Sequence, residues 1–402
     1  MSFRKFSADY VFDGYRLLKD AVIVMEEDGT VQQVVNIDDA GTDVHHFKGV
    51  LCPGLVNCHC HIELSHLKNV IPPHTGLVNF LVSVVQKRGF NPDAIQRSME
   101  AAEQEMYKNG IVAVGDICNT TDAVKLKSNS GLYWHSFIEV LSFTDELADA
   151  QMKHYSNVLL EHEKVLFPRY KNVLSPHAPY TISPKTFQFI NDQTQNQIIS
   201  IHSQEHPAED QLYIQGDGDY LKLFRIFGFK ESPFPVTGKS SLQSYLPHFD
   251  NGQTLLLVHN SYITEEDILF ANNYAETKGL TLLYCLCINA NRYIEDKEPP
   301  IELLVKHQCK LVLGTDSYSS NWQLSIAKEI ESILNTDFFR KQSYKDSVET
   351  VFTWATINGA RALQIENVFG SFEQGKRPGV VLIENMFENE LKGKNIVSKR
   401  IF

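Results

Sequence analysis

The sequence of 402 residues predicts an α/β protein, a (β/α)8 TIM barrel with a small β-sandwich domain built from both chain termini. Three observations support this fold. Short β-branched runs alternate with helical patterns through the middle of the chain. Polar residues end several of these runs, where such a barrel gathers its active site. Strand-like segments occur at both ends of the chain. We therefore expect residues 1–50 and 370–402 to form the sandwich and residues 51–369 to form the barrel.

The N-terminal part of the chain contains a hairpin pattern. Residues 21–25 and 31–35 are apolar runs, and the turn between them contains Asp28-Gly29. At the other end, residues 375–383 have the same short, apolar strand character. We expect these terminal segments to meet in one small sheet domain.

The middle of the chain contains eight strand candidates. They are Gly54–His61, Ile111–Ile117, Tyr133–Val140, Asn172–Pro176, Ile198–His202, Thr254–His259, Thr281–Leu286 and Lys310–Gly314. Helical patterns lie between them, for example Pro92–Asn109, Pro184–Asn191, Thr264–Lys278 and Glu302–Gln308, several of which follow a capping residue. A doubly wound open sheet uses the same local pattern, but the polar residues at many strand ends favour the barrel.

The composition is that of an ordinary globular protein, with 43% hydrophobic and 21% charged residues. A formal net charge of -12 disfavours binding to nucleic acid or to an anionic membrane, so we expect a small-molecule substrate. The seven cysteines follow no disulfide or zinc spacing and predict buried, reduced thiols. The N-terminus lacks an apolar signal core and no run is long enough to span a membrane, which predicts a cytoplasmic location.

The first strand candidate ends in two histidines one residue apart. In an extended strand, His59 and His61 project to the same face, while Cys58 and Cys60 point the other way. The two imidazoles therefore converge on one point. This motif alone fits either a metal site or two ordinary half-buried histidines.

Other strand candidates also end in groups that can bind a metal or move a proton. His202 ends Ile198–His202, His259 ends Thr254–His259, and Asp316 follows Gly314 by two residues. His59, His61, His202 and Asp316 together offer three imidazoles and one carboxylate, a set that suits Zn²⁺ or Fe²⁺ and leaves room for water. A bound ion lowers the pKa of water and so favours hydrolysis. Glu205 lies where it could transfer the proton of that water to a substrate.

These motifs resemble the metal-dependent amidohydrolase superfamily, in its adenosine-type/aminodeoxyfutalosine deaminase and chlorohydrolase branch, over nearly the whole chain. The resemblance implies a (β/α)8 barrel with one divalent ion, zinc being favoured over iron, held by His59, His61, His202 and Asp316. It also implies that Glu205 is a proton shuttle, that His259 contacts the nucleophilic water and developing charge, and that Asp316 is a second proton acceptor. Barrels of this type frequently pair, so the resemblance also points to a homodimer.

The segment after the fourth strand bears on metal number and substrate. Branches with two metals carry a carboxylated lysine there, whereas residues 173–181 contain none and Lys171 lies too early. The run from Ser175 to Thr181 looks like that of enzymes that deaminate adenine-type nucleosides, which implies that His177 donates to a ring nitrogen. We therefore expect hydrolytic removal of ammonia from a 6-aminopurine nucleoside derivative of the aminodeoxyfutalosine, methylthioadenosine or S-adenosylhomocysteine type.

Two positions are less defined. Arg292 stands where an apolar residue is usual in the resembling enzymes, and it is either a partner for a substrate carboxylate or a solvated loop residue. Glu139 is a strand-end carboxylate without an assigned partner. The alternatives for the whole protein are an amidohydrolase or chlorohydrolase acting on another ring amide or halogenated heterocycle, and a non-catalytic scaffold.

Overall fold

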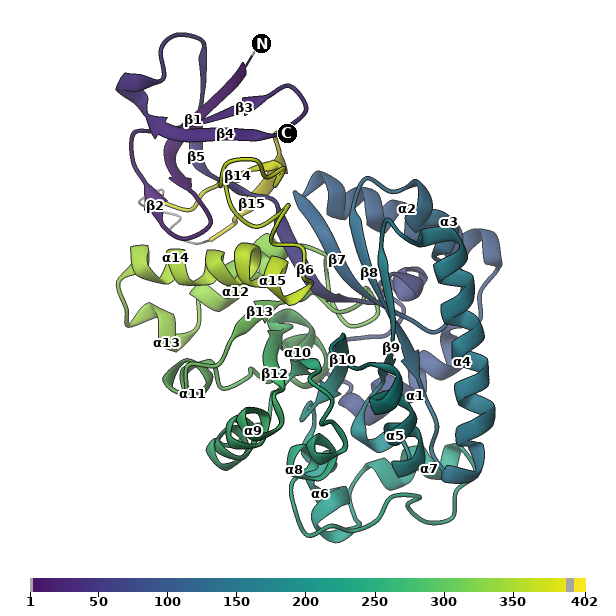
Figure 1. The fold of residues 1–402 in the computed structure, drawn as a ribbon. Coiled ribbons are helices and arrows are strands. Elements are labelled where there is room, and N and C mark those ends of the chain that lie inside the picture. The colour runs from purple at the N-terminus through teal and green to yellow at the C-terminus, as the bar shows by residue number, and fades with distance from the viewer. Residues whose placement is uncertain (1–2, 388–393) are drawn as a thin grey trace.

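The structure is a computed structural model that describes residues 3–387 and 394–402. It has an α/β fold with one mixed sheet near both termini and two parallel sheets in the middle of the chain (Figure 1). The mixed sheet consists of β1 (Phe3–Phe12), β2 (Leu17–Leu18), β3 (Ala21–Glu26), β4 (Val31–Asn36), β5 (Val44–Pro53), β14 (Val380–Glu384) and β15 (Val397–Arg400).

The mixed sheet confirms that the two ends of the chain meet. Its order is β15-β14-β5-β1-β3-β4, with β2 paired to β1, so that a C-terminal strand hydrogen-bonds to β5. The predicted hairpin is present as the antiparallel pair β3 and β4, with a turn closed between Glu26 and Thr30. These strands lie in one sheet, and the second layer of a sandwich stays a prediction.

The eight predicted strands of the middle region are confirmed in two four-stranded parallel sheets. The first contains β6 (Leu55–Cys60), β7 (Ile111–Cys118), β8 (Tyr133–Val140) and β9 (Lys171–Pro176) in that order. The second contains β10 (Ile198–Ser203), β11 (Thr254–His259), β12 (Thr281–Leu286) and β13 (Leu311–Leu313). Because each sheet is parallel, its strands end at the same edge, which brings the polar residues after them together.

Backbone hydrogen bonds connect the two parallel sheets near those ends. The amide of His202 in β10 donates to the carbonyl of His177, which follows β9, over 2.9 Å. The amides of Thr315 and Asp316, which follow β13, both donate to the carbonyl of His59 in β6 over 3.0 Å. Closure of all eight strands into one barrel stays a prediction.

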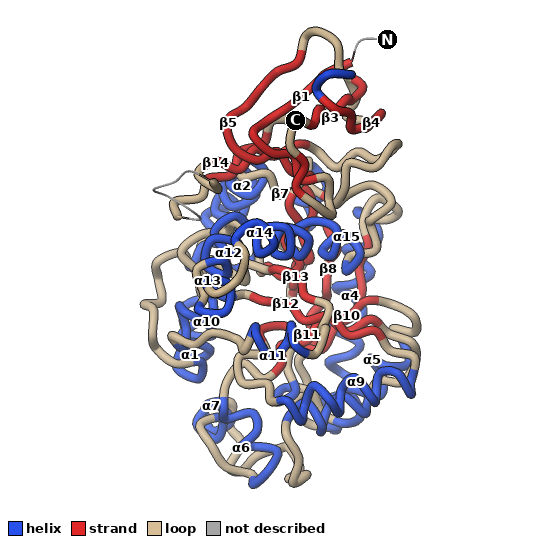
Figure 2. The backbone as a smooth tube through the Cα atoms, turned by 90° about the vertical axis from the view of Figure 1, so that its left-hand side faces the viewer, coloured by secondary structure: helices blue, strands red, loops and turns tan. Residues whose placement is uncertain are grey.

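Helices cover the outside of the parallel sheets (Figure 2). The helices that follow the first four strands are α1 (Leu77–Lys87), α2 (Pro92–Lys108), α3 (Val124–Asn129), α4 (Asp145–Leu166) and α5 (Pro184–Gln193). The later helices are α6 (Pro207–Gln215), α7 (Tyr220–Ile226), α8 (Ser241–Tyr245), α9 (Glu265–Lys278), α10 (Ile288–Glu295), α11 (Ile301–Lys306), α12 (Ile326–Leu334), α13 (Asp337–Arg340), α14 (Tyr344–Thr353) and α15 (Gly359–Ala362). Among the described residues, none of these helices combines the length and apolar character needed to cross a bilayer.

The four helices predicted from the sequence are present as α2, α5, α9 and α11, with ends that differ by one or two residues. Capping explains most of these ends. The Ser183 side chain accepts from the amide of Thr186 at the start of α5, and Thr264 and Asp267 form a reciprocal capping box at the start of α9.

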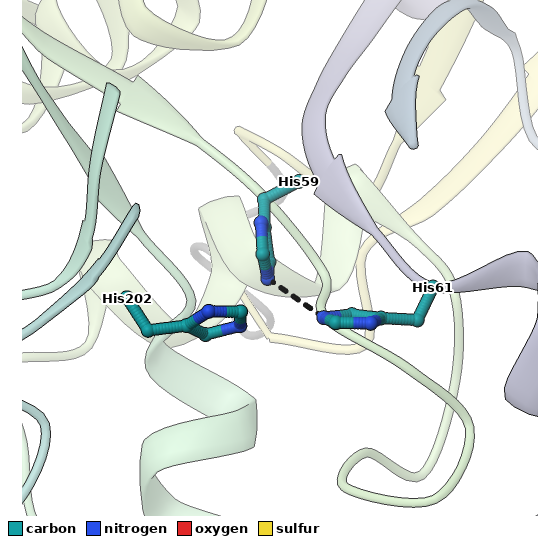
Figure 3. A group of neighbouring side chains, drawn as sticks. All are labelled: His59, His61 and His202. Atoms are coloured by element: carbon teal, nitrogen blue, oxygen red, sulfur yellow. Dashed lines mark hydrogen bonds between the residues drawn. The ribbon is translucent and has the colours of Figure 1, made fainter. Parts of the chain in front are cut away.

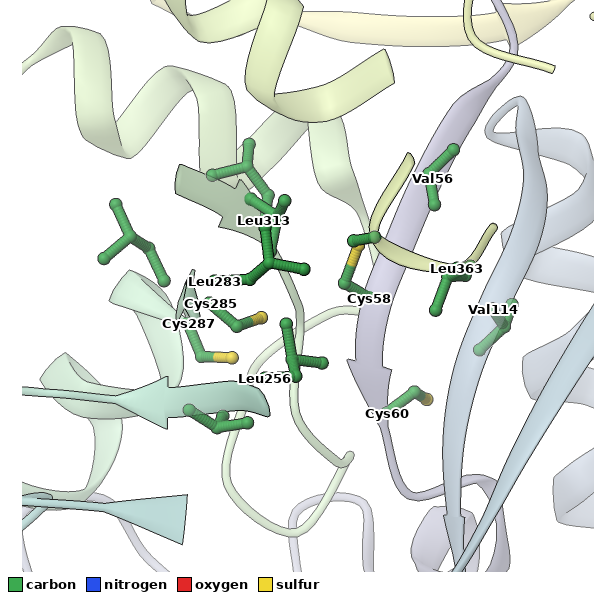
Figure 4. Close-up of a cluster of buried hydrophobic side chains, with 14 of the residues drawn as sticks. Val56, Cys58, Cys60, Val114, Leu256, Leu283, Cys285, Cys287, Leu313 and Leu363 are labelled. Carbon is green, nitrogen blue, oxygen red and sulfur yellow. The ribbon is translucent and has the colours of Figure 1, made fainter. Parts of the chain in front are cut away.

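The interior between the strands is apolar and contains most of the cysteines. Cys58 and Cys60 on β6 lie among Val56, Val114 and Leu363, and Cys285 and Cys287 lie near Leu283 and Leu313 (Figure 4). All seven thiols are free, and every one except the half-buried Cys309 is buried. The prediction of buried, reduced cysteines is therefore confirmed, and it agrees with the alternation that directs His59 away from this core.

Candidate metal centre and active site

A cavity opens at the C-terminal ends of the parallel strands. It measures about 910 Å³ including its opening to solvent. Apart from Arg88 after α1, its polar lining comes from the ends of seven strands and the loops after them: His61, Asn119, Glu139, His177, Thr181, His202, Glu205, His259, Asp316, Ser317 and Ser319. Its apolar lining comes mainly from α1, α7 and the segment after β8. The cavity thus lies where parallel α/β folds bind their ligands.

His59 and His61 direct the same ring nitrogen to one point, as their spacing predicts. Their Nε2 atoms lie 3.2 Å apart, and the ring of His202 approaches from β10 so that ligand atoms of all three lie within 4.8 Å of one another (Figure 3). Burial, followed by the neighbouring imidazoles of His61 and His202, lowers the pKa of His59 well below its usual value. Neutral imidazole is the form that binds a metal ion.

The backbone sets the tautomer of His202. Its Nδ1 donates to the carbonyl of His177 over 2.7 Å, which leaves Nε2 without a proton and free to act as a ligand. Burial lowers the pKa of His202 to about 3, with His177 as the next cause. The ring is therefore held neutral with one nitrogen available.

Asp316 completes this group of donors. Its Oδ1 lies 3.4 Å from Nε2 of His61 and 3.7 Å from Nε2 of His59, while its Oδ2 accepts a 2.7 Å hydrogen bond from the Ser320 hydroxyl. Atoms bound to one tetrahedral zinc ion at about 2.1 Å lie roughly 3.4 Å from one another. The donor atoms of His59, His61 and His202 are close enough to hold one divalent ion, and Asp316 adds a carboxylate beside two of these imidazoles.

Asn57 and Thr315 connect β6, which carries His59, to the segment after β13, which carries Asp316. The Asn57 side chain in β6 donates to the Thr315 hydroxyl over 2.8 Å and accepts from the Thr315 amide over 3.0 Å. Asp316 itself has a φ of 58°, in the left-handed region that non-glycine residues seldom adopt. The cost of this conformation is offset by hydrogen bonds that hold the carboxylate in place.

Glu205 and His259 face each other beside these donors. Oε1 of Glu205 lies 3.6 Å from Nε2 of His259, and both side chains are buried. The Asn291 amide donates to Nδ1 of His259 over 3.3 Å, so that Nε2 carries the proton and points into the site. Burial raises the pKa of Glu205 well above its usual value, with Asp316 and Glu209 adding to the effect.

His177 and Glu139 form another part of the cavity wall. Nε2 of His177 lies 4.0 Å from Oε1 of Glu139, and its Nδ1 is 3.0 Å from the Thr181 hydroxyl. Oε2 of Glu139 accepts from the Asn119 amide over 2.9 Å, whereas Oε1 is buried without a hydrogen-bond partner among the described residues. The position of Glu139 near the end of β8 was the sequence signal that it could belong to the site, but the sequence did not identify its neighbours, which come from other strands.

Seven of the eight candidate site residues come together in this region, and Arg292 does not. Its guanidinium pairs with Glu298 and belongs to a separate surface recess beside Lys328 and Glu331. The chain continues after β12 into α10, and this helix carries Arg292 away from the cavity. Arg88, at the end of α1, lines the cavity instead.

The arrangement also bears on a second metal ion. Glu139, His177 and His202 form another group with metal-binding donor atoms, but Nδ1 of His202 is occupied by its hydrogen bond to the His177 carbonyl. Lys171 is exposed, and its Nζ donates to Gln364. These contacts favour one ion over two.

Comparison with known proteins agrees with this geometry. The chain resembles a 5-methylthioadenosine/S-adenosylhomocysteine deaminase of Halothermothrix orenii, with 26% identity over 92% of this chain and 80% of that protein. The fold matches the Helicobacter pylori aminofutalosine deaminase in complex with methylthio-coformycin, with a TM-score of 0.78 and 22% identity over 94% of this chain and 92% of that one. It also matches an adenosine deaminase from Xanthomonas campestris with bound zinc, with a TM-score of 0.70 and 20% identity over 96% and 86% of the two chains. Residues 50–398 match the model of the Amidohydrolase family, and the chain therefore belongs to that family.

Proposed function

We propose that this protein is a metal-dependent hydrolase of carbon-nitrogen bonds that deaminates a 6-aminopurine nucleoside derivative and releases ammonia. The substrate is of the aminodeoxyfutalosine, methylthioadenosine or S-adenosylhomocysteine type. The observation that carries this proposal is the convergence of three imidazoles and the Asp316 carboxylate beside the facing pair Glu205 and His259. The names of the similar enzymes support the choice of a purine nucleoside.

The proposed architecture is a closed (β/α)8 barrel over residues 51–369, with residues 1–50 and 370–402 in a β-sandwich. Support comes from the eight parallel strands and from the hydrogen bonds that join β9 to β10 and β13 to β6. Antiparallel pairing between β5 and β14 supports a terminal domain built from both ends of the chain.

His59, His61, His202 and Asp316 are the proposed ligands of one divalent ion, with zinc favoured over iron. When bound, such an ion activates water for attack and stabilises negative charge. The protein's own contribution is to hold these donors in fixed orientations. The His177 carbonyl fixes the tautomer of His202, and Ser320 orients Asp316 so that one oxygen stays available.

Glu205 is the proposed proton shuttle. Because burial raises its pKa, this carboxyl retains a proton more readily than an exposed glutamate does. It can therefore accept a proton from water and deliver it to the ring nitrogen next to the amine-bearing carbon. Protonation of that nitrogen makes the carbon more susceptible to attack.

His259 is proposed to stabilise the charge that develops during attack. Asn291 holds its proton on Nε2, and burial lowers its pKa to about 3, so the ring stays a neutral hydrogen-bond donor. A buried donor aimed at developing charge costs little reorganisation. Asp316 is the proposed second acceptor of the proton of the nucleophilic water.

His177 is the proposed donor to a purine ring nitrogen. It lines the cavity, and Thr181 fixes one of its ring nitrogens while the other lies near Glu139. Arg292 has no part in this proposal because its guanidinium pairs with Glu298 outside the cavity.

The proposal is tested with zinc-loaded protein against adenosine, methylthioadenosine, S-adenosylhomocysteine, aminodeoxyfutalosine, guanine and cytosine. Ultraviolet absorbance and ammonia release are measured together. We expect turnover of at least one adenine nucleoside. Absence of turnover on every compound, with one metal ion bound per chain, would reject a purine substrate. It would favour another ring amide or a halogenated heterocycle as the substrate. A chain that binds no zinc or iron would instead favour the non-catalytic scaffold.

A further inference from the structure

Arg88 is the one lysine or arginine among the described residues that line the cavity. It follows α1 as its C-terminal cap, and its side chain is exposed to solvent. In the described part of the chain, its guanidinium forms no hydrogen bond or ion pair. Five unused donors in a planar group are well suited to bind a carboxylate through two parallel hydrogen bonds.

The backbone that carries Arg88 is held in place although its side chain is free. The amide of Arg88 donates to the Val84 carbonyl over 2.9 Å, and its own carbonyl accepts from Nε2 of His66 over 3.0 Å. His66 follows β6 closely in the chain, so this contact ties the end of α1 to the region of the proposed metal ligands. The backbone of Arg88 is therefore fixed, while its guanidinium is available to a ligand.

The cavity wall that adjoins Arg88 is apolar. Phe80 and Val84 contribute from α1, and the ring of Phe143 lies 5.2 Å from that of Phe227. Val85 and Phe227 are 47% and 40% exposed, which is unusual for large apolar side chains that line a cavity. A ligand with an apolar group would cover this surface and bring its end toward Arg88.

The acidic side chains of the cavity lie among its histidines. Glu139 is near His177 and His202, Glu205 faces His259, and Asp316 is near His61. None of the apolar lining residues offers a negative charge to an ammonium group. The cavity therefore combines a polar region that suits the purine base with an apolar region that adjoins the positive charge of Arg88.

We propose that Arg88 binds a carboxylate at the far end of an apolar 5′ substituent of the nucleoside substrate. This inference rests on the proposed function and selects among its substrate types. Methylthioadenosine has an apolar substituent without charge, and S-adenosylhomocysteine adds an ammonium group beside its carboxylate. Aminodeoxyfutalosine ends in a carboxylate on an aromatic ring, and this chemistry matches both the Phe143 and Phe227 rings and the unpaired guanidinium.

A structural role for Arg88 has to be separated from recognition. A cation near a helix C-terminus interacts favourably with the helix dipole, and Lys87 provides the same charge one residue earlier. The Lys87 ammonium donates to the Val70 carbonyl and does not line the cavity. Lys87→Gln is therefore a matched control that removes one positive charge from the same helix end.

The test compares zinc-loaded wild type, Arg88→Gln and Lys87→Gln on aminodeoxyfutalosine and methylthioadenosine. We expect Arg88→Gln to lower the ratio of kcat/KM for the carboxylate substrate to that for methylthioadenosine by about 10- to 100-fold, the range for a lost hydrogen bond to a charged group. The change should appear mainly in KM for the carboxylate substrate. Lys87→Gln should keep the wild-type ratio. An unchanged ratio in Arg88→Gln, or equal losses on both substrates, would overturn the inference.

A binding measurement separates this inference from the proposed function. Calorimetric titration of aminodeoxyfutalosine into zinc-loaded Glu205→Gln should give a Kd about 10- to 100-fold lower than titration into Glu205→Gln with Arg88→Gln. Turnover of nucleosides without an effect of Arg88 would reject the inference alone. Absence of both turnover and binding for every adenine nucleoside would reject the proposed function, and the inference with it.

Discussion

The carboxylate Oε1 of Glu205 lies 3.6 Å from Nε2 of His259; Glu205 follows β10, and His259 ends the neighbouring parallel strand β11. Because Asn291 holds the proton of His259 on Nε2, a donor and a titratable carboxyl face the same space beside the proposed metal ligands. This pairing distinguishes the site from a simple metal-binding cluster, since it adds a group that can move a proton.

Replacement of Glu205 by glutamine should remove turnover and leave the metal bound. General acid–base groups contribute about 10²- to 10⁴-fold to rate, so we expect kcat to fall by about that factor. Ammonia release gives the rate, and elemental analysis gives the metal content. Glu103→Gln is the control because Glu103 is also buried, accepts from the Ser130 hydroxyl and does not line the cavity. Loss of the metal in Glu205→Gln would contradict the assignment as a shuttle.

The hydroxyl of Ser320 should increase metal affinity although it is not a proposed ligand. It donates to Oδ2 of Asp316 over 2.7 Å and so orients the other oxygen. Loss of such a partner costs about 10- to 100-fold in metal affinity or activity, and Ser320→Ala should show this in a competitive zinc titration. Ser347→Ala is the control, because that buried hydroxyl donates to the Ser343 carbonyl near the start of α14. Equal zinc affinities of the two variants would argue that Asp316 is held by its backbone alone.

Gly314 should be intolerant of a side chain because it lies against a proposed ligand. A Cβ atom at this position would be 2.8 Å from Cβ of His59 and 2.9 Å from Sγ of Cys285. Overpacking of this kind costs about 1–3 kcal/mol, and a shift of His59 should also weaken zinc binding in Gly314→Ala. Urea unfolding and zinc titration measure the two effects. Gly89→Ala, where a Cβ meets nothing within 4 Å, should change neither.

The proposed metal ligands could be predicted from the sequence because local rules place them. Alternation along a strand directs His59 and His61 to one face, and the ends of parallel strands bring His202, His259 and Asp316 to the same edge. These rules depend on the chain near each residue. The geometry that joins the five side chains then follows from the order of the strands.

The substrate-facing residues could not be predicted in the same way. Arg292 follows a site-like motif, but α10 turns its side chain toward Glu298. Arg88 lines the cavity as the C-terminal cap of α1, and sequence spacing does not encode this contact. The apolar run of α1 was the one available indication, since it has more large apolar residues than a half-exposed helix needs.

A buried carboxylate outside the site should make stability depend on pH. Glu329 in α12 is fully buried and accepts hydrogen bonds from Asn289 and Asn321. Burial raises the pKa of Glu329 to about 7, against an ordinary value of 4.5, although these hydrogen bonds oppose the shift. Between these two pH values the folded chain holds the Glu329 proton more tightly than the unfolded chain does. The resulting stabilisation is complete below about pH 4.5 and is lost as the pH rises through about 7.

Glu329→Gln should therefore flatten the decline in the free energy of unfolding between pH 5 and pH 8. Between these two pH values, the free energy of unfolding should fall by on the order of 3 kcal/mol more in wild type than in the variant. Urea unfolding at both pH values, with zinc saturating, measures the difference. Glu302→Gln on the exposed side of α11 removes the same charge at the surface and should follow the wild type. Parallel pH profiles for wild type and Glu329→Gln would mean that the carboxylate is already ionised in the folded protein, because its three amide donors then outweigh the cost of burial.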